Sequence, residues 1–85
     1  MPYEVILKKS VKKELEKLPE PLHRKLIQHL HALESNPRPV GVKKLQGREA
    51  YRTRVGSYRV LYEIDDAKKR IQVFSIGDRK DVYRV

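Results

Sequence analysis

The sequence predicts a two-layer α+β domain of the order β-α-α-β-β-β, in which a helical hairpin packs on one face of a mainly antiparallel sheet. Three observations support this fold class. The chain has 85 residues, enough for a single domain, 1–85, with one modest core. Two segments near the N-terminus repeat apolar residues at helical spacing. Three later segments are rich in β-branched and aromatic residues and are separated by turn-forming residues.

The first strand and the first helix are predicted close to the N-terminus. Residues 3–8, YEVILK, form a short β-prone run. Ser10 is expected to cap the following helix, because apolar residues recur at spacings of four and three from position 11 to position 18. Pro19 then ends this helix.

The second helix is predicted to begin at about Pro21. Its apolar stripe repeats at spacings of four, four and three, through Leu22, Leu26, Leu30 and Leu33. Two further prolines, at positions 37 and 39, require the helix to end before Pro37. Because only a tight proline turn separates the two helices, they are expected to form an αα-hairpin.

The C-terminal half is predicted to be a loop followed by three strands. The segment Asn36 to Arg48, NPRPVGVKKLQGR, has two prolines, two glycines and no clear period, so we interpret it as a loop with some extended character. The strands are expected at Ala50 to Val55, Tyr58 to Ile64 and Arg70 to Ile76. Gly56 and Ser57 form a two-residue hairpin turn, and the polar run DDAKK joins the last two strands.

A two-residue turn fixes how the side chains of the hairpin are sorted. It pairs position 55 with 58 and position 54 with 59, and so on along both strands. Alternation then places one set of side chains toward the helices: Tyr51, Thr53, Val55, Tyr58, Val60 and Tyr62. The opposite face receives Arg52, Arg54 and Arg59, and this spacing would let three guanidinium groups converge on one small anion.

The charge of the chain supports this interpretation. The formal net charge is +9, with a pI near 10.0, which favours a polyanionic partner such as nucleic acid, or an acidic protein. The segment from position 38 to position 59 holds seven basic residues and one acidic residue. A solvated surface is the alternative explanation of the arginines. Arginine rather than lysine at all three positions favours a phosphate site, because the planar guanidinium matches two phosphate oxygens.

Several other classes of function lack their usual residues. The chain has no cysteine, which is compatible with a reducing cytoplasm. The N-terminal apolar run is too short to span a bilayer and lacks the layout of a signal peptide, so the protein is expected to be cytoplasmic and not membrane-bound. The three histidines lack the spacing of a metal-binding helix, and phosphate-cradling glycine loops and serine-nucleophile motifs are missing. No metal or cofactor is expected.

The C-terminal run SIGDRKDVYRV places Arg79, Lys80 and Tyr83 just beyond the last predicted strand. One interpretation is that Tyr83 closes the end of the core. The other is that its phenol stacks on a base or, with a pKa lowered by the arginines, moves a proton.

These motifs resemble the RelE/ParE toxin superfamily, and specifically its RelE-like branch of mRNA interferases. The resemblance extends over nearly the whole chain, through "LQGREAYRTRVGSYRVLYEID" and "VFSIGDRKDVY". Its most specific parts are the G-x-YR-hydrophobic-x-Y pattern from Gly56 to Tyr62, the I-G-x-R pattern from Ile76 to Arg79, and the tyrosine four residues later. The sequence departs from many relatives at Asp78, where they carry a basic residue or histidine.

The resemblance implies a toxin that cleaves mRNA in the ribosomal decoding site without a metal. The ribose 2′-OH would attack the neighbouring phosphate and leave a 2′,3′-cyclic phosphate and a free 5′-OH. The implied catalytic residues are Arg52, Arg54, Arg59, Arg79 and Tyr83, and the implied RNA-binding residues are Lys43, Lys44, Arg48 and Lys80. Arginine stays protonated in proteins, so the base could be Tyr83 or a water, or the mechanism could be purely electrostatic.

The same superfamily offers two further functions. A ParE-like toxin would bind DNA gyrase and have no nuclease activity, and a weak relative would bind only its antitoxin. All of these imply a cognate antitoxin whose acidic segment wraps the basic domain, with operator DNA contacted only through that complex. Ribosome and mRNA are partners of the nuclease alone.

Overall fold

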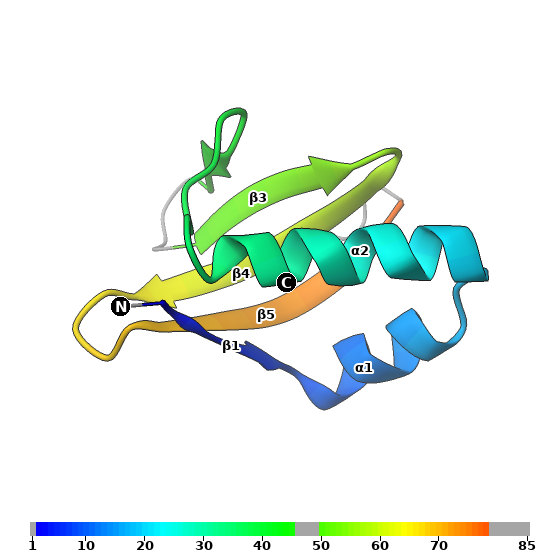
Figure 1. Cartoon of the computed structure of the whole chain (residues 1–85), viewed down its shortest axis with the longest axis horizontal. Coiled ribbons are helices and arrows are strands. Elements are labelled where there is room, and N and C mark those ends of the chain that lie inside the picture. The colour runs from blue at the N-terminus through cyan, green and yellow to red at the C-terminus, as the bar shows by residue number, and fades with distance from the viewer. Residues whose placement is uncertain (1, 46–49, 79–85) are drawn as a thin grey trace.

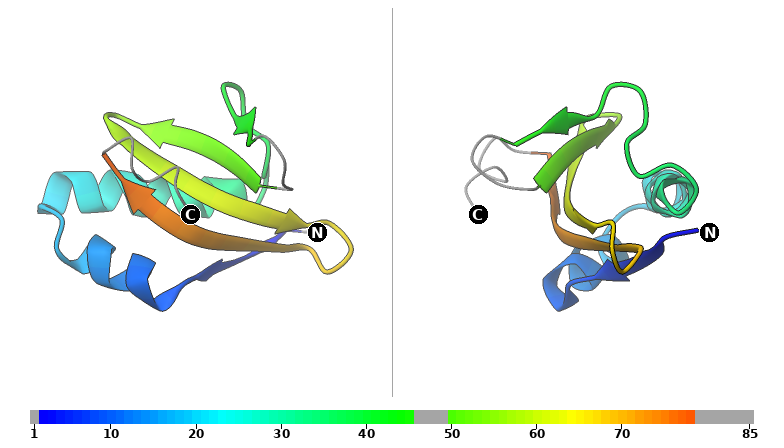
Figure 2. Two further views of the ribbon diagram at one scale, coloured as in Figure 1. Left: turned by 180° about the vertical axis from the view of Figure 1, so that it is seen from behind. Right: turned by 90° about the vertical axis from the view of Figure 1, so that its left-hand side faces the viewer.

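The computed structural model describes residues 2–45 and 50–78, which form two helices and a five-stranded sheet. Both helices lie against the same face of the sheet (Figures 1 and 2). The helices are α1 (Lys9–Glu16) and α2 (Glu20–Leu33), and the strands are β1 (Glu4–Leu7), β2 (Lys43–Lys44), β3 (Ala50–Val55), β4 (Tyr58–Asp65) and β5 (Arg70–Gly77). The predicted two-layer α+β architecture is confirmed.

The strands lie in the order β1-β5-β4-β3-β2. The first strand pairs in parallel with β5, and every other pairing is antiparallel. The two helices therefore carry the chain from β1 at one edge to β2 at the other, across one face (Figure 1). The helices α1 and α2 do not cover the other side of the hairpin of β3 and β4, which we call the helix-free face (Figure 2).

The second strand locates the extended character predicted within the 36–48 loop at Lys43–Lys44, and positions 46–48 of that loop lie outside the described residues. Lys43 pairs with Arg52 and Lys44 pairs with Tyr51, so the two lysines form a short edge strand on β3. Gly41, with φ +89°, precedes this strand in a turn. Lysine at the edge of a sheet discourages pairing with other chains. A two-residue strand has no sequence period of its own, which is why the composition of this segment could not predict it.

The start of the first helix differs from the prediction, whereas that of the second agrees with it. Ser10 does not cap α1: the N-cap position is Lys8, with extended backbone and no side-chain capping bond. The amide of Lys8 still donates to the carbonyl of Val73 in β5, so the strand ends and the helix begins within one residue. Helix α2 begins at Glu20 with Pro21 in its first turn, where proline is well tolerated. Its end at Leu33 agrees with the predicted stop before Pro37.

The core lies between the helices and the sheet, as the leucine stripes predicted. It consists of Val11, Leu15, Leu26, Leu30, Leu33, Val60, Tyr62, Ile71, Val73 and Ile76. Tyr62 is fully buried, and its hydroxyl donates to the carbonyl of Pro37 at 2.7 Å, so the loop after α2 is attached to the core. Burial raises the pKa of this phenol well above its ordinary value. His23 of α2 donates from Nδ1 to the carbonyl of Leu15 at 2.8 Å, which links the two helices.

Candidate phosphate-binding site

The site is built on the tight turn between β3 and β4. Gly56 has φ +62° and Ser57 is not among the residues with positive φ, which is the sign pattern of a type II′ turn. The resulting register is the predicted one: Val55 pairs with Tyr58 and Arg54 pairs with Arg59. The pairing continues without interruption to Ala50 and Glu63. The turn therefore fixes which side chains face the helices.

The helix side of the hairpin is as predicted. Val60 and Tyr62 belong to the core, and Tyr51, Val55 and Tyr58 pack around it. Thr53 is 5% exposed and completes this set.

The opposite side of the hairpin carries the three predicted arginines. Arg54 and Arg59 are directly opposite each other, and Arg52 is opposite Leu61 one pair further along. Side chains of directly paired residues start about 4.5 to 5.5 Å apart at Cβ. Arg54 is exposed and the other two are half-buried. The side chain of Arg59 donates from Nη1 to the carbonyl of Asp78 at 3.2 Å, which holds it against the end of β5.

Strand β2 adds one lysine to this side of the sheet. Lys43 pairs with Arg52, and paired residues in a sheet project to the same face, so Lys43 extends the arginine cluster. Lys44 pairs with Tyr51 and belongs by alternation to the helix side. The helix-free face thus gathers Lys43, Arg52, Arg54 and Arg59, which we call the basic half. The other predicted site residues, Arg48, Arg79, Lys80 and Tyr83, lie outside the described residues.

Arg38 belongs to the basic segment of the sequence but not to this cluster. Its guanidinium holds Asp66 with two bonds, of 3.3 Å to Oδ1 and 3.0 Å to Oδ2, and lies 5.1 Å from the ring centre of Tyr51. Asp66 also accepts from the Tyr3 hydroxyl at 2.6 Å. The bonds from Arg38 and Tyr3 lower the pKa of Asp66. Arg38 therefore serves the fold, by attaching the loop after α2 to the β4–β5 turn.

The sequence analysis missed a polar contact beneath the arginines. His29 of α2 and Thr53 of β3 form a hydrogen bond of 3.1 Å between Nε2 and Oγ1. Thr53 lies between Arg52 and Arg54, so this bond attaches the central residue of the arginine strand to the helical layer. Half-burial lowers the pKa of His29 by desolvation. A helical histidine and a strand threonine 24 residues apart gave no sequence signal for this contact.

The sequence analysis also missed a bulge in β5. Leu61 pairs with Ser75 but Tyr62 pairs with Val73, so Phe74 is an extra residue in β5. Because of this insertion, both Val73 and Ile76 reach the core although they are three residues apart. The bulge sets the direction in which β5 leads to Gly77, which is paired with Arg59. It could not be predicted because the register across the DDAKK turn was open.

The described side chains of the basic half are cations that can donate hydrogen bonds to a phosphate. Preorganised cations of this kind stabilise the charge that develops on a phosphate during transfer. Among the described residues, no group of three or more histidine and acidic side chains could hold a metal ion. Neither α1 nor α2, the helices in the described part of the chain, is long and apolar enough to cross a membrane.

These features define a class of protein: a small, strongly basic α+β domain with a helical hairpin on one sheet face and clustered arginines on the other. Comparison with known proteins identifies the family. Residues 5–83 match the model of the ParE toxin of the type II toxin-antitoxin system, parDE. The chain belongs to this family, within the RelE/ParE superfamily of type II toxins.

Relatives from bacteria and archaea carry RelE names. The chain is 30% identical to toxin RelE of Mycobacterium tuberculosis, over 99% of this chain and 89% of the relative. It is 32% identical to the putative toxin RelE1 of Methanocaldococcus jannaschii, over 99% of this chain and 98% of the relative.

Solved structures of RelE proteins share the fold. The archaeal RelE–RelB complex from Pyrococcus horikoshii OT3 gives a TM-score of 0.85 at 34% identity, over 94% of this chain and 98% of that chain. A mutant of E. coli toxin RelE in the free state gives a TM-score of 0.82 at 28% identity, over 99% of this chain and 93% of that chain.

Proposed function

We propose that this toxin is a ribosome-dependent mRNA endoribonuclease. The single observation that carries the proposal is the register that places Arg52, Arg54 and Arg59 on the helix-free face, with Arg54 directly opposite Arg59. A scissile RNA phosphate bound there would be neutralised by several fixed donors. The RelE names of the relatives support the same branch of the superfamily.

In the proposed reaction the ribose 2′-OH attacks the adjacent phosphorus. A bond forms between O2′ and phosphorus, the bond from phosphorus to O5′ breaks, and a 2′,3′-cyclic phosphate and a 5′-OH result. The 2′-OH loses its proton and the leaving O5′ gains one. Negative charge increases on the non-bridging oxygens, where Arg54 and Arg59 would act as electrostatic stabilisers. Arginines cannot accept the proton, so the base is Tyr83, a water, or no single group, and Arg79 is a further proposed donor to the phosphate.

The ribosome would contribute the alignment of the mRNA. Binding of a flexible single strand to the basic half costs free energy, because the strand must be ordered on the protein. A ribosome-bound codon is already ordered. Lys43, Arg48 and Lys80 are the proposed contacts to RNA around the scissile phosphate. Lys44 lies on the helix side and would contact RNA away from that phosphate.

A cognate antitoxin is the second proposed partner. The solved RelE–RelB complex of P. horikoshii supports such an assembly for this family. The net charge of +9 favours an antitoxin segment that is acidic, disordered when free, and ordered on the toxin. Coexpression with such an antitoxin should restore the growth of cells that express the toxin.

A ParE-like toxin that targets DNA gyrase is the second candidate function. The match of residues 5–83 to the ParE toxin model favours it. The convergent arginines disfavour it, because poisoning a protein target does not require a phosphate site. DNA breaks in expressing cells, with translation unaffected, would identify this alternative.

The decisive experiment maps mRNA ends after purified toxin is added to programmed ribosomes. Wild-type protein should generate new ends within the decoding site, and Arg59→Ala should lower the cleavage rate by about 100-fold or more, the usual effect of losing one transition-state donor. Arg24→Ala is the matched control, because Arg24 lies on α2 and pairs with Glu20 at 2.7 Å. Growth arrest by the wild type without any cleavage of mRNA would contradict the proposal.

A further inference from the structure

The helix-free face is divided into two halves by charge. The basic half lies next to the Gly56 turn. Further from the turn, the paired residues of this face include acidic and neutral side chains. Glu63 of β4 pairs with Gln72 of β5, and Asp65 pairs with Arg70. On β1, Glu4 pairs with Arg70. The distribution of charge therefore favours binding of a polyanion with its phosphates on the basic half.

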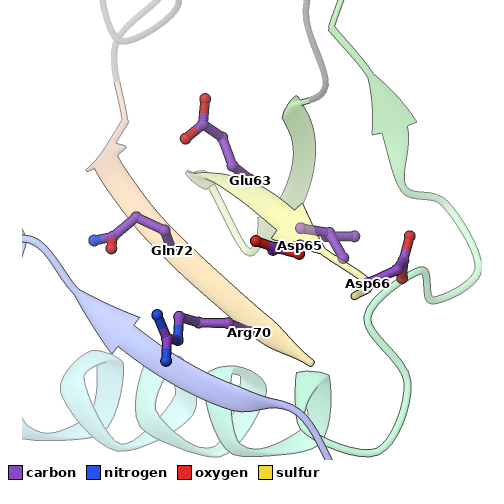
Figure 3. Close-up of a pocket in the computed structure, with 6 residues that line it drawn as sticks. Glu63, Asp65, Asp66, Arg70 and Gln72 are labelled. Carbon is purple, nitrogen blue, oxygen red and sulfur yellow. The ribbon is translucent and has the colours of Figure 1, made fainter. Parts of the chain in front are cut away.

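A hollow lies in the second half of the face. Its volume is about 480 Å³, which is within the range of small-molecule sites. It is lined by Glu63, Ile64, Asp65, Asp66, Arg70 and Gln72. Figure 3 shows Glu63 and Gln72 on neighbouring strands at one end of the hollow, with Arg70 and the Asp66 turn at the other.

The far end of the hollow consists of side chains that serve the fold. Asp66 holds Arg38 and Tyr3. The carboxylate of Asp65 accepts from the amide of Lys68 at 3.1 Å and so shapes the turn. Arg70 and Glu4 form an ion pair with 3.5 Å between Nε and Oε1. A ligand bound at this end would have to displace contacts that stabilise the fold.

Glu63 and Gln72 lie at the end that adjoins the arginines. Arg52 pairs with Leu61, and Glu63 follows two residues later on β4, about 6.8 Å along the strand. A nucleotide whose phosphate rests on the basic half would thus have the hollow beside it. A second phosphate would be repelled by the carboxylate of Glu63, whereas a neutral base would not.

We propose that this hollow binds a nucleobase of the RNA, and that Glu63 and Gln72 select bases that carry an exocyclic amino group. This inference rests on the proposed function and adds the specificity of the same site. A carboxylate accepts from the amino group of cytosine, and single-stranded RNA is read through such base edges. The amide of Gln72 can donate to the adjacent ring nitrogen. Uracil presents carbonyl oxygens instead of an amino group, and these face the carboxylate unfavourably.

The test measures the binding of short RNA to the complete toxin. The probes are five-residue oligocytidine and oligouridine, 2′-O-methylated so that neither can be cleaved, and affinity is read by fluorescence anisotropy. Wild type should bind the cytidine probe about fivefold more tightly or better. In Glu63→Gln and in Gln72→Ala this ratio should fall toward one. Removal of an acid strengthens the binding of any RNA, so the ratio rather than either affinity is the readout.

Glu16→Gln is the matched control, because Glu16 is an exposed carboxylate at the end of α1. This variant should keep the wild-type ratio. Equal binding of the two probes by wild type, binding of neither, or an unchanged ratio in both site variants would overturn the inference. Thermal unfolding of each variant verifies that it is folded.

Cleavage on ribosomes separates this inference from the function on which it rests. If wild type prefers cytidine, loses that preference in Glu63→Gln and yet cleaves nothing, the base site stands and the nuclease function fails. If wild type cleaves mRNA and the distribution of cut sites and the binding ratio are both unchanged in Glu63→Gln, the nuclease stands and the base site fails.

Discussion

Gly56 is the residue on which the geometry of the arginine cluster depends. Its φ of +62° lies in the left-handed region, where a side chain is strained even though a Cβ added there would meet nothing within 4 Å. The requirement is thus one of backbone conformation and not of space. Glycine before Ser57 therefore favours the turn that makes Arg54 and Arg59 direct partners.

Replacement of Gly56 by alanine should destabilise the protein. We expect a loss of about 1 kcal/mol, because the left-handed conformation costs about 1–2 kcal/mol for an L-residue and a stiffer unfolded chain offsets part of it. For a domain of this size the thermal midpoint should fall by about 4–8 °C, which circular dichroism can follow. Ser57→Ala at the neighbouring turn position should have little effect. An unchanged midpoint in Gly56→Ala would refute the account of the turn.

Arg38 and Lys44 show that the sequence alone does not tell which cations of a basic segment face the anion site. Both lie in the stretch whose charge predicted an anion site. Arg38 instead holds Asp66, and Lys44 falls on the helix side by strand alternation. The partner of Arg38 is 28 residues away, so only the folded chain brings them together.

At the scale of elements, α2 and β3 are joined by the contact between His29 and Thr53. The helix stripe predicted which leucines of α2 face the sheet, and hydrophobic patterning alone accounts for that packing. His29 adds a hydrogen bond to Thr53, which lies between Arg52 and Arg54 in β3. Its neutral form is favoured by burial, so the contact should depend on pH.

Protonation of His29 should destabilise the fold. Its folded-state pKa lies below the ordinary value of about 6.5, so the unfolded chain takes up the proton first. The free energy of unfolding should therefore decrease as the pH falls from about 7.5 through 6.5 toward the folded-state pKa. Urea unfolding at several pH values should show this decrease in wild type and a smaller one in His29→Gln. His31→Gln, an exposed histidine on α2, is the control, and equal slopes for wild type and His29→Gln would contradict the prediction.

The elements that could be predicted are those governed by local sequence. The hairpin of β3 and β4 was predicted residue by residue, because a two-residue turn determines both register and facing. The strand β2 and the parallel pairing of β1 with β5 depend on segments distant in sequence, and the bulge at Phe74 depends on packing at Val73 and Ile76. Local patterns carry no information about these features.

At the scale of the whole molecule, charge and fold act together. The αα-hairpin covers one sheet face with apolar contacts, and four cations lie together on the opposite face at the Gly56 end. The fold class followed from the order of helical and strand-like patterns. The predicted position of the site came from combining the charge pattern with the hairpin register. The acidic second half of the face could not be predicted in this way, because it depends on where Glu4 of β1 and Asp65 of β4 lie in the folded sheet.

This distribution of charge predicts a measurable salt dependence. The three arginines are expected to share one phosphate and Lys43 to contact the next, so neutralisation of about two phosphates of a single strand should give a slope of about −1.4 in log K against log salt. Lys43→Gln should reduce the magnitude of this slope by about 0.7. The slope can be measured by anisotropy with an uncleavable RNA oligonucleotide between about 50 and 200 mM salt. Arg24→Gln on α2 should leave the slope unchanged. An equal effect of the two variants would show that RNA binding depends on the net charge of the protein and not on the basic half.

The shared phosphate site is tested most directly by following the arginine side chains themselves. NMR of the guanidinium NH groups can be recorded while a dinucleotide with a 2′-deoxy sugar, which cannot be cleaved, is added. We predict that the signals of Arg52, Arg54 and Arg59 shift together with a single dissociation constant, while those of Arg24 and Arg38 stay in place. Independent shifts with different constants, or shifts of similar size at all five arginines, would contradict a shared phosphate site.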